Sequence, residues 1–283
     1  MTTTEPSVRR RDLHVPGGPL AALEALPDEP APGTAPVVLV PGYTGTKEDF
    51  AAILAPLADA GRHVVAIDQR GQFETAGPDA PSAYTVDALG RDLLAVIAAL
   101  GGRADVVGHS FGGLVARSAA IAAPEAFASL VLLGSGPAAI GGDRRERMAA
   151  LEPVLAAYGM AGVYAALEAL AAGDPDWVAA PAEHKDFLRR RFLASSPVGL
   201  QAMGDALRAE PDRTAALAAT GVALLVAYGE HDDGWQPAVQ AEMAARLGAP
   251  AAVVRGAVHS PAAQAPAATV AALLRFWSTV DGR

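Results

Sequence analysis

Short apolar runs alternate with longer stretches of helical period along most of the chain, and this alternation constrains the fold most strongly. The runs are Val37–Val40, Val64–Ile67, Asp105–Gly108, Leu130–Leu133, Val222–Ala227 and Ala251–Val254. The helical stretches are Lys47–Ala60, Thr85–Leu100, Gly112–Ala122, Pro237–Leu247 and Ala262–Val280. Near-continuous apolar strands are typical of a parallel sheet covered by helices on both faces. The order therefore predicts an α/β fold with a doubly wound, mostly parallel sheet.

One segment interrupts the alternation. Between about Gly141 and Glu210 there is no strand-like run, and the pattern predicts helices at Arg144–Tyr158, Gly162–Ala172 and Ala182–Ala194. We expect residues 1–140 and 211–283 to form the core and residues 141–210 to form a helical cap, or lid, at the carboxyl edge of the sheet. The alternative is a decorated crossover with no role in ligand binding.

Composition excludes several classes of protein. Of the 283 residues, 51% are hydrophobic and 19% are charged, which excludes an intrinsically disordered chain. The net charge of −9 disfavours binding to a phosphate backbone, so no nucleic-acid partner is expected. The basic runs, such as Arg9–Arg11, are interpreted as solvated faces or helix ends. Since the chain has no cysteine, disulfides, metal–thiolate sites and a Cys nucleophile are all excluded.

We expect no export signal near Met1, because no apolar segment follows Arg9–Arg11. The uncharged stretch Gly256–Leu274 contains two prolines and His259, which disfavour a membrane helix. We therefore expect a cytoplasmic protein with no membrane span.

The most specific motif is Gly108-His109-Ser110-Phe111-Gly112, a G-x-S-x-G sequence. It directly follows a predicted strand and opens a predicted helix, which is the context that a nucleophile elbow requires. Such a tight turn strains the backbone at the Ser and exposes its hydroxyl beside a helix N-terminus. Ser110 is therefore the candidate nucleophile, and a structural Gly-rich turn is the alternative.

A nucleophilic Ser needs a base, and His259 is the best candidate. In the chain order Ser, acid, His, the base follows both of its partners. His259 lies in a loop after the last predicted strand, whereas His231 comes too early and His109 is expected to point away from the Ser110 side chain. The acid is expected in the loop that leaves Val222–Ala227, with Asp232 as first choice and Asp233 as the alternative acid.

These motifs resemble the α/β-hydrolase superfamily, in particular serine hydrolases of the esterase and lysophospholipase type. The similarity spans about Val37 to Trp277. The sequence Val40-Pro41-Gly42-Tyr43-Thr44-Gly45 resembles the family's oxyanion loop, and Asp68-Gln69-Arg70-Gly71-Gln72 resembles its D-x-R-G-x-G loop. The resemblance implies a sheet of about eight strands with the cap inserted after the sixth strand.

The resemblance also implies a catalytic triad of Ser110, Asp232 and His259. It implies an oxyanion hole formed by the backbone N–H groups of Tyr43 and Phe111. Two departures stand out, because Pro41 replaces the usual His and Gln72 replaces the usual Gly. Asp68 and Arg70 are interpreted as structural.

The function expected from these residues is hydrolysis of a carboxylic ester or related acyl bond, a carboxylesterase-like activity of class EC 3.1. An acyltransferase, a perhydrolase and a carbon–carbon bond hydrolase would use the same triad, and a non-enzymatic ligand-binding protein is a further alternative. In this superfamily haloalkane dehalogenases and epoxide hydrolases carry Asp at the elbow, so Ser110 argues against both. No dinucleotide, P-loop or H-E-x-x-H motif occurs, so we expect neither a cofactor nor a metal.

The substrate is expected to be a small, mostly apolar acyl compound, because the cap segment is rich in Ala, Leu and Val. Larger candidates for the pocket wall are Met148, Tyr158, Met160, Tyr164, Trp177, Phe187, Phe192 and Met203. For most of these residues, packing of the cap helices against one another is the simpler interpretation.

Overall fold

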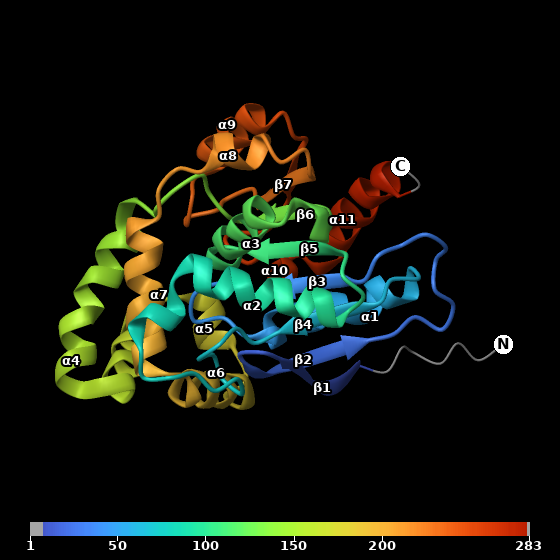
Figure 1. Cartoon of the computed structure of the whole chain (residues 1–283). Helices are drawn as coiled ribbons and strands as arrows, with labels where there is room; N and C mark the ends of the chain where they lie inside the picture. The colour runs from blue at the N-terminus through green and yellow to red at the C-terminus, as the bar shows by residue number, and fades with distance from the viewer. Residues whose placement is uncertain (1–7, 282–283) are drawn as a thin grey trace.

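A computed structural model describes residues 8–281, and within that range one eight-stranded sheet forms the centre of the molecule (Figure 1). The strands are β1 (Val8–Val15), β2 (Gly18–Ala25), β3 (Val37–Val40), β4 (Val64–Ile67), β5 (Ala104–His109), β6 (Phe127–Leu133), β7 (Ala223–Gly229) and β8 (Ala251–Val254). Their spatial order is β1-β2-β4-β3-β5-β6-β7-β8. Among these strands β2 is antiparallel to both neighbours and every other pair is parallel. The predicted mostly parallel sheet is confirmed.

Helices cover both faces of this sheet. Around the core these helices are α1 (Ala51–Asp59), α2 (Val86–Ala99), α3 (Phe111–Ala122), α8 (Thr214–Ala218), α9 (Pro237–Leu247), α10 (Pro261–Gln264) and α11 (Pro266–Val280). Short 3₁₀ helices occur at η1 (Lys47–Phe50), η2 (Pro81–Tyr84) and η3 (Pro124–Ala126). The doubly wound arrangement follows from this two-sided cover.

Side chains of each central strand alternate between the two apolar layers. On β3, Val38 and Val40 belong to the layer formed with α2, α3 and α9. Val37 and Leu39 belong to the layer formed with α1 and α11. All four are fully buried, which explains why a strand with a period of two appears in the sequence as a continuous apolar run.

Four helices lie between β6 and α8, and we call them the cap helices. They are α4 (Gly142–Ala171), α5 (Pro175–Ala179), α6 (Ala182–Ala194) and α7 (Pro197–Ala209). Figure 1 shows them grouped beside one end of the sheet. α4 bends at Gly159, whose φ of 62° and ψ of −164° lie outside the helical region. This break coincides with the end of the predicted helix Arg144–Tyr158.

Helix α7 was not predicted, because the last helix expected in the cap ends at Ala194, before Ser196-Pro197. Proline is tolerated in the first turn of a helix, where its missing N–H would have no helical partner. The Ser196 side chain caps the helix by accepting a hydrogen bond from the Gly199 N–H at 3.0 Å. The Ser-Pro pair is therefore a helix start.

The sequence predicted one continuous C-terminal helix over Ala262–Val280, and this prediction was wrong. It is split into α10 and α11 at Ala265, whose φ of −141° and ψ of 62° are not helical. The residue before a proline is disfavoured in the helical region, so Pro266 begins a new helix.

The hairpin formed by β1 and β2 was also missed. Arg9–Arg11 lies on β1 and is not a helix end, while Arg9 and Arg10 are exposed, as predicted for a solvated face, and Arg11 is half-buried. Arg9 and Arg11 both pair with Glu24, a buried residue of β2, and Arg10 pairs with Glu74. Buried carboxylates require such partners, so these arginines help to attach the edge hairpin to the sheet.

Within the described residues, α4 is the helix that has the length and apolar composition of a membrane span, with a mean hydropathy of 1.5 over an 18-residue window. It also contains Pro153 and the break at Gly159, and its residues pack with α6 and α7 in one apolar cluster. α4 resembles a membrane span in length and composition only. The expected absence of a membrane span therefore stays a prediction.

Candidate active site

Ser110 lies between the end of β5 and the first residue of α3. Its φ of 53° and ψ of −119° are unusual for any residue other than glycine. Neighbouring glycines make this turn possible. A Cβ at Gly108 would lie 2.5 Å from the Gly112 carbonyl oxygen, and a Cβ at Gly112 would lie 2.4 Å from that of Val40. The predicted elbow geometry is therefore present.

His259 brings its imidazole to this turn from the loop after β8. Its Nε2 lies 2.9 Å from the Ser110 Oγ, and its Nδ1 lies 2.8 Å from Asp232 Oδ1. A carboxylate only accepts hydrogen bonds, so Nδ1–H donates to Asp232 and leaves Nε2 of the neutral ring able to accept from the Ser110 hydroxyl. Such a chain of contacts can move a proton from the hydroxyl to the imidazole. The three residues chosen from the sequence thus lie together, and all three are buried.

Asp232 is held by more than its imidazole partner. Its Oδ1 also accepts from the Gly234 N–H at 2.8 Å, and its Oδ2 accepts from Gln240 Nε2 at 2.9 Å. Burial raises the pKa of Asp232, but the hydrogen bonds from His259, Gln240 and Gly234 outweigh it and leave the pKa below its usual value. The carboxylate is therefore ionised at neutral pH. Gln240 carried no motif in the sequence and was missed.

Asp233, the alternative acid, lies near Asp232 and His259, but its carboxylate is paired with arginines of α4. Its carboxylate pairs with Arg144 of α4 at 2.7 Å and with Arg147 at 3.7 Å, and its side chain is 45% exposed. The structure therefore brings Asp232, and not Asp233, into contact with His259.

His109 supports the His259 loop. Its Nε2 lies 2.7 Å from the His259 carbonyl oxygen, which can only accept, so His109 donates. The two rings also pack against each other with centroids 5.1 Å apart. Burial, together with the nearby His259, lowers the pKa of His109 to about 4, so its ring is neutral at pH 7. Its side chain makes this contact in place of one with the Ser110 hydroxyl.

The two proposed oxyanion donors flank the elbow. Phe111 is the first residue of α3, and its N–H is among those that a helix leaves without an internal partner. Tyr43 is the third residue after β3, and the backbone at its neighbour Gly42 touches the elbow, since a Cβ at Gly42 would lie 3.0 Å from the Ser110 Cβ. Burial raises the pKa of Tyr43 above its usual value.

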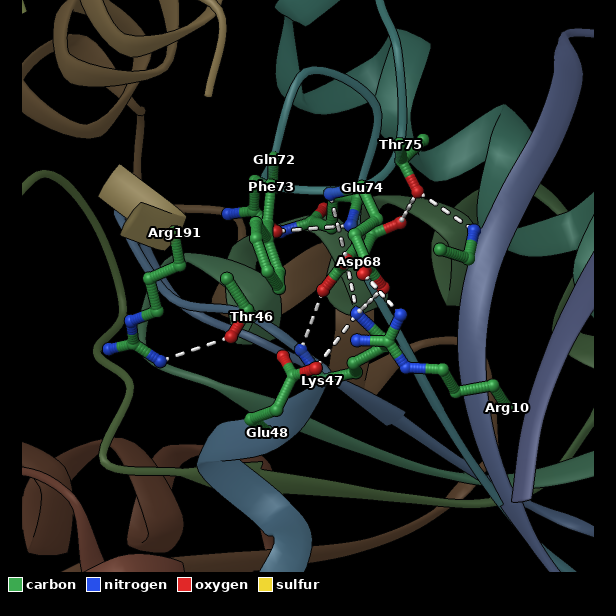
Figure 2. Close-up of polar contacts among 12 residues, drawn as sticks. Arg10, Thr46, Lys47, Glu48, Asp68, Gln72, Phe73, Glu74, Thr75 and Arg191 are labelled. Carbon is green, nitrogen blue, oxygen red and sulfur yellow. Dashed lines mark hydrogen bonds and ion pairs between the residues drawn. The ribbon is translucent and has the colours of Figure 1, made fainter. Parts of the chain in front are cut away.

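A buried lysine joins the segment after Tyr43 to the loop after β4. Lys47 is fully buried and contacts Asp68 at 2.8 Å, Glu74 at 2.7 Å and Glu48 at 2.9 Å, as Figure 2 shows. Burial lowers the pKa of Lys47, but these carboxylates outweigh it and raise the pKa above its usual value. Asp68 therefore serves a structural role, as expected from the sequence. Arg70 also has a structural role, because its guanidinium pairs with the carboxylate of Asp92.

A cavity of about 900 Å³ opens above Ser110, between the sheet and the cap helices. Its floor includes Ser110, His259 and Tyr43, and its cap wall is mainly apolar. Among the aromatic and Met candidates taken from the sequence, Met148, Phe187 and Phe192 line it. Tyr158 is instead 74% exposed, and Met203 packs within a buried cluster. Most of that set therefore has a packing or surface role.

One group in the described part of the chain has the ligand types for a metal ion. Atoms of Asp232, Asp233 and His259 lie within 4.8 Å of one another. Each is already engaged, because His259 Nδ1 and Asp232 bond each other and Asp233 pairs with Arg144. This donor set is more simply explained by hydrogen bonding.

Comparison with known proteins gives a family match across most of the chain. A model of the Alpha/beta hydrolase family matches residues 37–273. In sequence, the chain is 34% identical over 103 residues to Epoxide hydrolase A of Mycobacterium tuberculosis, covering 36% of this chain and 32% of that protein. It is also 34% identical over 151 residues to RutD of Cronobacter turicensis, named as a carbamate hydrolase, covering 53% and 55% of the two chains. The chain thus spans about a third and about half of the lengths of these relatives.

Solved structures match along nearly the full length. A carboxylesterase study of Nitrososphaera gargenis supplies one match, with a TM-score of 0.76, 22% identity and coverage of 95% and 98%. A hydrolase from Pseudomonas aeruginosa PA01 gives a TM-score of 0.74, 26% identity and the same coverage. An esterase from Thermogutta terrifontis gives a TM-score of 0.75, 22% identity and coverage of 96% and 99%.

Proposed function

The chain belongs to the alpha/beta hydrolase family, and from that premise we propose that it is a serine hydrolase that cleaves a carboxylic ester or a related acyl bond. The observation that carries the proposal is the contact of His259 Nε2 with the Ser110 Oγ at 2.9 Å, with Asp232 on the other ring nitrogen. This arrangement suits a nucleophile with a base and a group that orients the base.

In the proposed reaction, the Ser110 Oγ attacks the carbonyl carbon of the substrate while His259 Nε2 takes the hydroxyl proton. Asp232 keeps the imidazole in the required tautomer and stabilises the imidazolium that forms. His259 then gives the proton to the leaving group, and an acyl-enzyme remains on Ser110. A water molecule, deprotonated by the same imidazole, attacks this ester and restores Ser110.

The negative charge that develops on the substrate oxygen needs donors beside Ser110. We assign this role to the backbone N–H groups of Tyr43 and Phe111. Phe111 supports the assignment because it opens α3, whose N-terminus favours negative charge. Tyr43 supports it because its loop packs directly against the elbow at Gly42.

The cavity favours an apolar acyl substrate. Its cap wall includes Met148, Leu151, Leu155, Leu167, Phe187 and Leu200. Two charged side chains at its margin are paired, since Arg191 pairs with Asp49 and Arg208 pairs with Glu152 and Asp205. An apolar enclosure with few polar groups near the reacting atom is typical of small-molecule sites.

The relative named as an epoxide hydrolase does not change this proposal. That similarity covers 36% of the chain, and Ser110 stands where epoxide hydrolases of the superfamily carry Asp. The similarity to the relative named as a carbamate hydrolase covers 53% of the chain. A carbamate also contains an acyl carbon that Ser110 could attack, so it belongs among the substrates to be tested.

The experiment is a panel of aryl esters with acyl chains of graded length, together with one aryl carbamate, and Ser110→Ala is the blank. We expect hydrolysis by the wild type, with kcat/KM rising as apolar carbons are added until the cavity is filled. The blank is expected to lose activity by a factor of about 10⁴ or more. Equal rates for wild type and Ser110→Ala would contradict the proposal.

A further inference from the structure

We propose that Gln72 and Gln69 are positioning residues for the oxyanion hole, and that they act through the peptide groups that precede Tyr43. The inference rests on the proposed function, in which the Tyr43 N–H is one of the two donors to the oxyanion. Neither glutamine touches the substrate in this account. Each acts through the backbone that it holds.

Two amide hydrogen bonds carry the inference. Gln72 Nε2 donates to the Gly42 carbonyl oxygen at 2.8 Å, and Gln69 Nε2 donates to the Pro41 carbonyl oxygen at 2.8 Å. Both glutamine side chains are buried. The Gly42 oxygen also accepts from the Gly45 N–H at 3.1 Å. Because buried amides lose water as an alternative partner, the two glutamine bonds add to this turn in fixing where the loop lies.

The orientation of the Gln72 amide is itself fixed. Its Oε1 accepts from the Gln69 backbone N–H at 3.0 Å, so the other end of the amide must be the NH₂ group that donates to Gly42. The Gln72 N–H also donates to the Gln69 carbonyl at 2.9 Å. The two glutamines therefore form one unit on the turn after β4.

The link to catalysis is the planarity of the peptide bond. The Gly42 carbonyl and the Tyr43 N–H belong to the same trans peptide group, so they lie in one plane and point in opposite directions. Holding the Gly42 oxygen from one side thereby holds the Tyr43 N–H toward the other. A hydrogen bond to the carbonyl also polarises the peptide and strengthens its N–H as a donor.

The opposite side of this loop is closed by the elbow. A Cβ at Gly42 would lie 3.0 Å from the Ser110 Cβ, and a Cβ at Gly112 would lie 2.5 Å from the Pro41 carbonyl oxygen. Thr44, the residue after Tyr43, has a φ of 60°, so the chain turns sharply there. The Gly42–Tyr43 peptide is therefore held between the glutamines and the nucleophile.

The glutamine-bearing turn has its own support. Figure 2 shows Gln72 on the same loop as Glu74 and Thr75. Glu74 pairs with the buried Lys47, and the Thr75 hydroxyl donates to the Asp68 carbonyl at 3.1 Å while accepting from the Ala21 N–H at 2.9 Å. The turn can therefore act as a rigid support for the side-chain amides of Gln69 and Gln72.

The proposal also gives a reason for two departures from the family pattern. Pro41 removes the side chain that the usual His would provide, and Gln72 stands where Gly is usual. In this chain Gln72 supplies a side-chain anchor to the loop that begins at Pro41. The two departures are thus parts of one arrangement.

The test uses Gln72→Met, which keeps the length of the side chain and removes the donor, and Gln69→Met as a second variant. We expect Gln72→Met to lower kcat on the best aryl ester about tenfold or more, with KM changed less than about twofold, since the loss falls on the transition state. The inhibition constant of a trifluoromethyl ketone, which forms a tetrahedral adduct with a Ser, is expected to rise in proportion. Gln69→Met should have a smaller effect, because it holds the peptide before the one that carries the donor.

The control is Ser129→Ala. This buried hydroxyl, which donates to Asp105 at 2.6 Å, lies in the amino-terminal half of β6, away from Ser110. It should lower the thermal midpoint without changing kcat or inhibitor affinity. If Gln72→Met does not fold, Gln72→Asn replaces it, because the shorter amide cannot reach Gly42.

The outcomes separate this inference from the proposed function. An active wild type together with unchanged kcat and inhibitor affinity in folded Gln72→Met or Gln72→Asn would overturn the positioning role alone. A change confined to KM would also overturn it. A wild type that hydrolyses no ester or carbamate and binds no trifluoromethyl ketone would overturn the proposed function, and with it this inference.

Discussion

Nδ1 of His259 lies 2.8 Å from Oδ1 of Asp232, although the two residues come from loops that follow different strands, β8 and β7. Gly234 makes this approach possible, because a Cβ there would lie 2.3 Å from Cε1 of the His259 ring. Gln240 and the Gly234 N–H hold the carboxylate from its other sides. The close approach at Gly234 and the hydrogen bonds from Gln240 and the Gly234 N–H therefore position this pair, in addition to the bond between His259 and Asp232.

Replacing Asp232 by Asn should abolish most of the activity while keeping the fold. An Asn oxygen can still accept from the ring, but it provides no negative charge to stabilise the imidazolium and allows the wrong tautomer. We expect kcat to fall by a factor of about 10³–10⁴. Asp233→Asn is the matched comparison, and it should change kcat by less than about threefold, because its exposed ion pair with Arg144 contributes little. The opposite ranking of the two variants would show that the acid assignment is wrong.

His109 should make the protein sensitive to acid. Its folded pKa, about 4, lies below its usual value of 6.5. Its neutral form is therefore favoured in the folded state, and the stabilisation is complete above pH 6.5 and lost as pH falls toward 4. From the size of that shift we expect His109 itself to contribute a decrease of roughly 3 kcal/mol in the free energy of unfolding over this window.

The measurement is urea unfolding at several pH values for the wild type and for His109→Gln, whose amide can still donate to the His259 carbonyl. The variant should lose stability less steeply between pH 6.5 and 4. Parallel curves for the two proteins would show that another group causes the acid sensitivity.

Lys47→Met should destabilise the fold strongly. Lys47 is the buried partner of Asp68, which is itself fully buried, so the variant leaves a carboxylate without its counter-charge. Breaking a buried pair in this way costs about 3–5 kcal/mol. The double variant Lys47→Met, Asp68→Asn should recover part of this loss, since the fully buried carboxylate of Asp68 is then removed, although Glu48 still lacks the lysine. Denaturant titration measures both, and a single variant within about 1 kcal/mol of wild type would contradict this account.

Leu167→Trp should shorten the acyl chain that the enzyme prefers. Leu167 lines the cavity from the second half of α4, and the larger ring would fill space that the substrate chain is expected to use. The optimum in the ester panel should move to shorter chains, with long-chain kcat/KM reduced about tenfold and acetate esters little affected. Val178→Trp, at a 63% exposed position of α5, is the control and should leave the profile unchanged. An unaltered profile in Leu167→Trp would place the acyl chain elsewhere.

Much of the sheet and the elbow could be predicted from the sequence because they depend on local patterns. The strands Val37–Val40, Val64–Ile67 and Ala251–Val254 have the predicted bounds, because turn residues and charges delimit each apolar run. Ser110 was identifiable because the strand, the strained turn and the helix are adjacent in the chain. His259 and Asp232 could be found through their order relative to the strands.

The parts that escaped prediction depend on contacts between distant segments. The β1–β2 hairpin has a mostly exposed first strand with three arginines, and only its pairing with Glu24 explains their placement. Gln240, His109 and the two glutamines of the turn after β4 bond partners that lie 8 to 150 residues away. No local pattern distinguishes a glutamine that holds a carbonyl from one on the surface.

The most direct test of the central claim is covalent labelling by a fluorophosphonate probe, followed by peptide mass spectrometry. We expect one phosphonate per chain, located on Ser110. Labelling should be absent in Ser110→Ala, strongly slowed in Asp232→Asn and retained in Asp233→Asn. A wild type that stays unlabelled beside a labelled control esterase, or a label on another residue, would contradict the claim that Ser110 is the nucleophile.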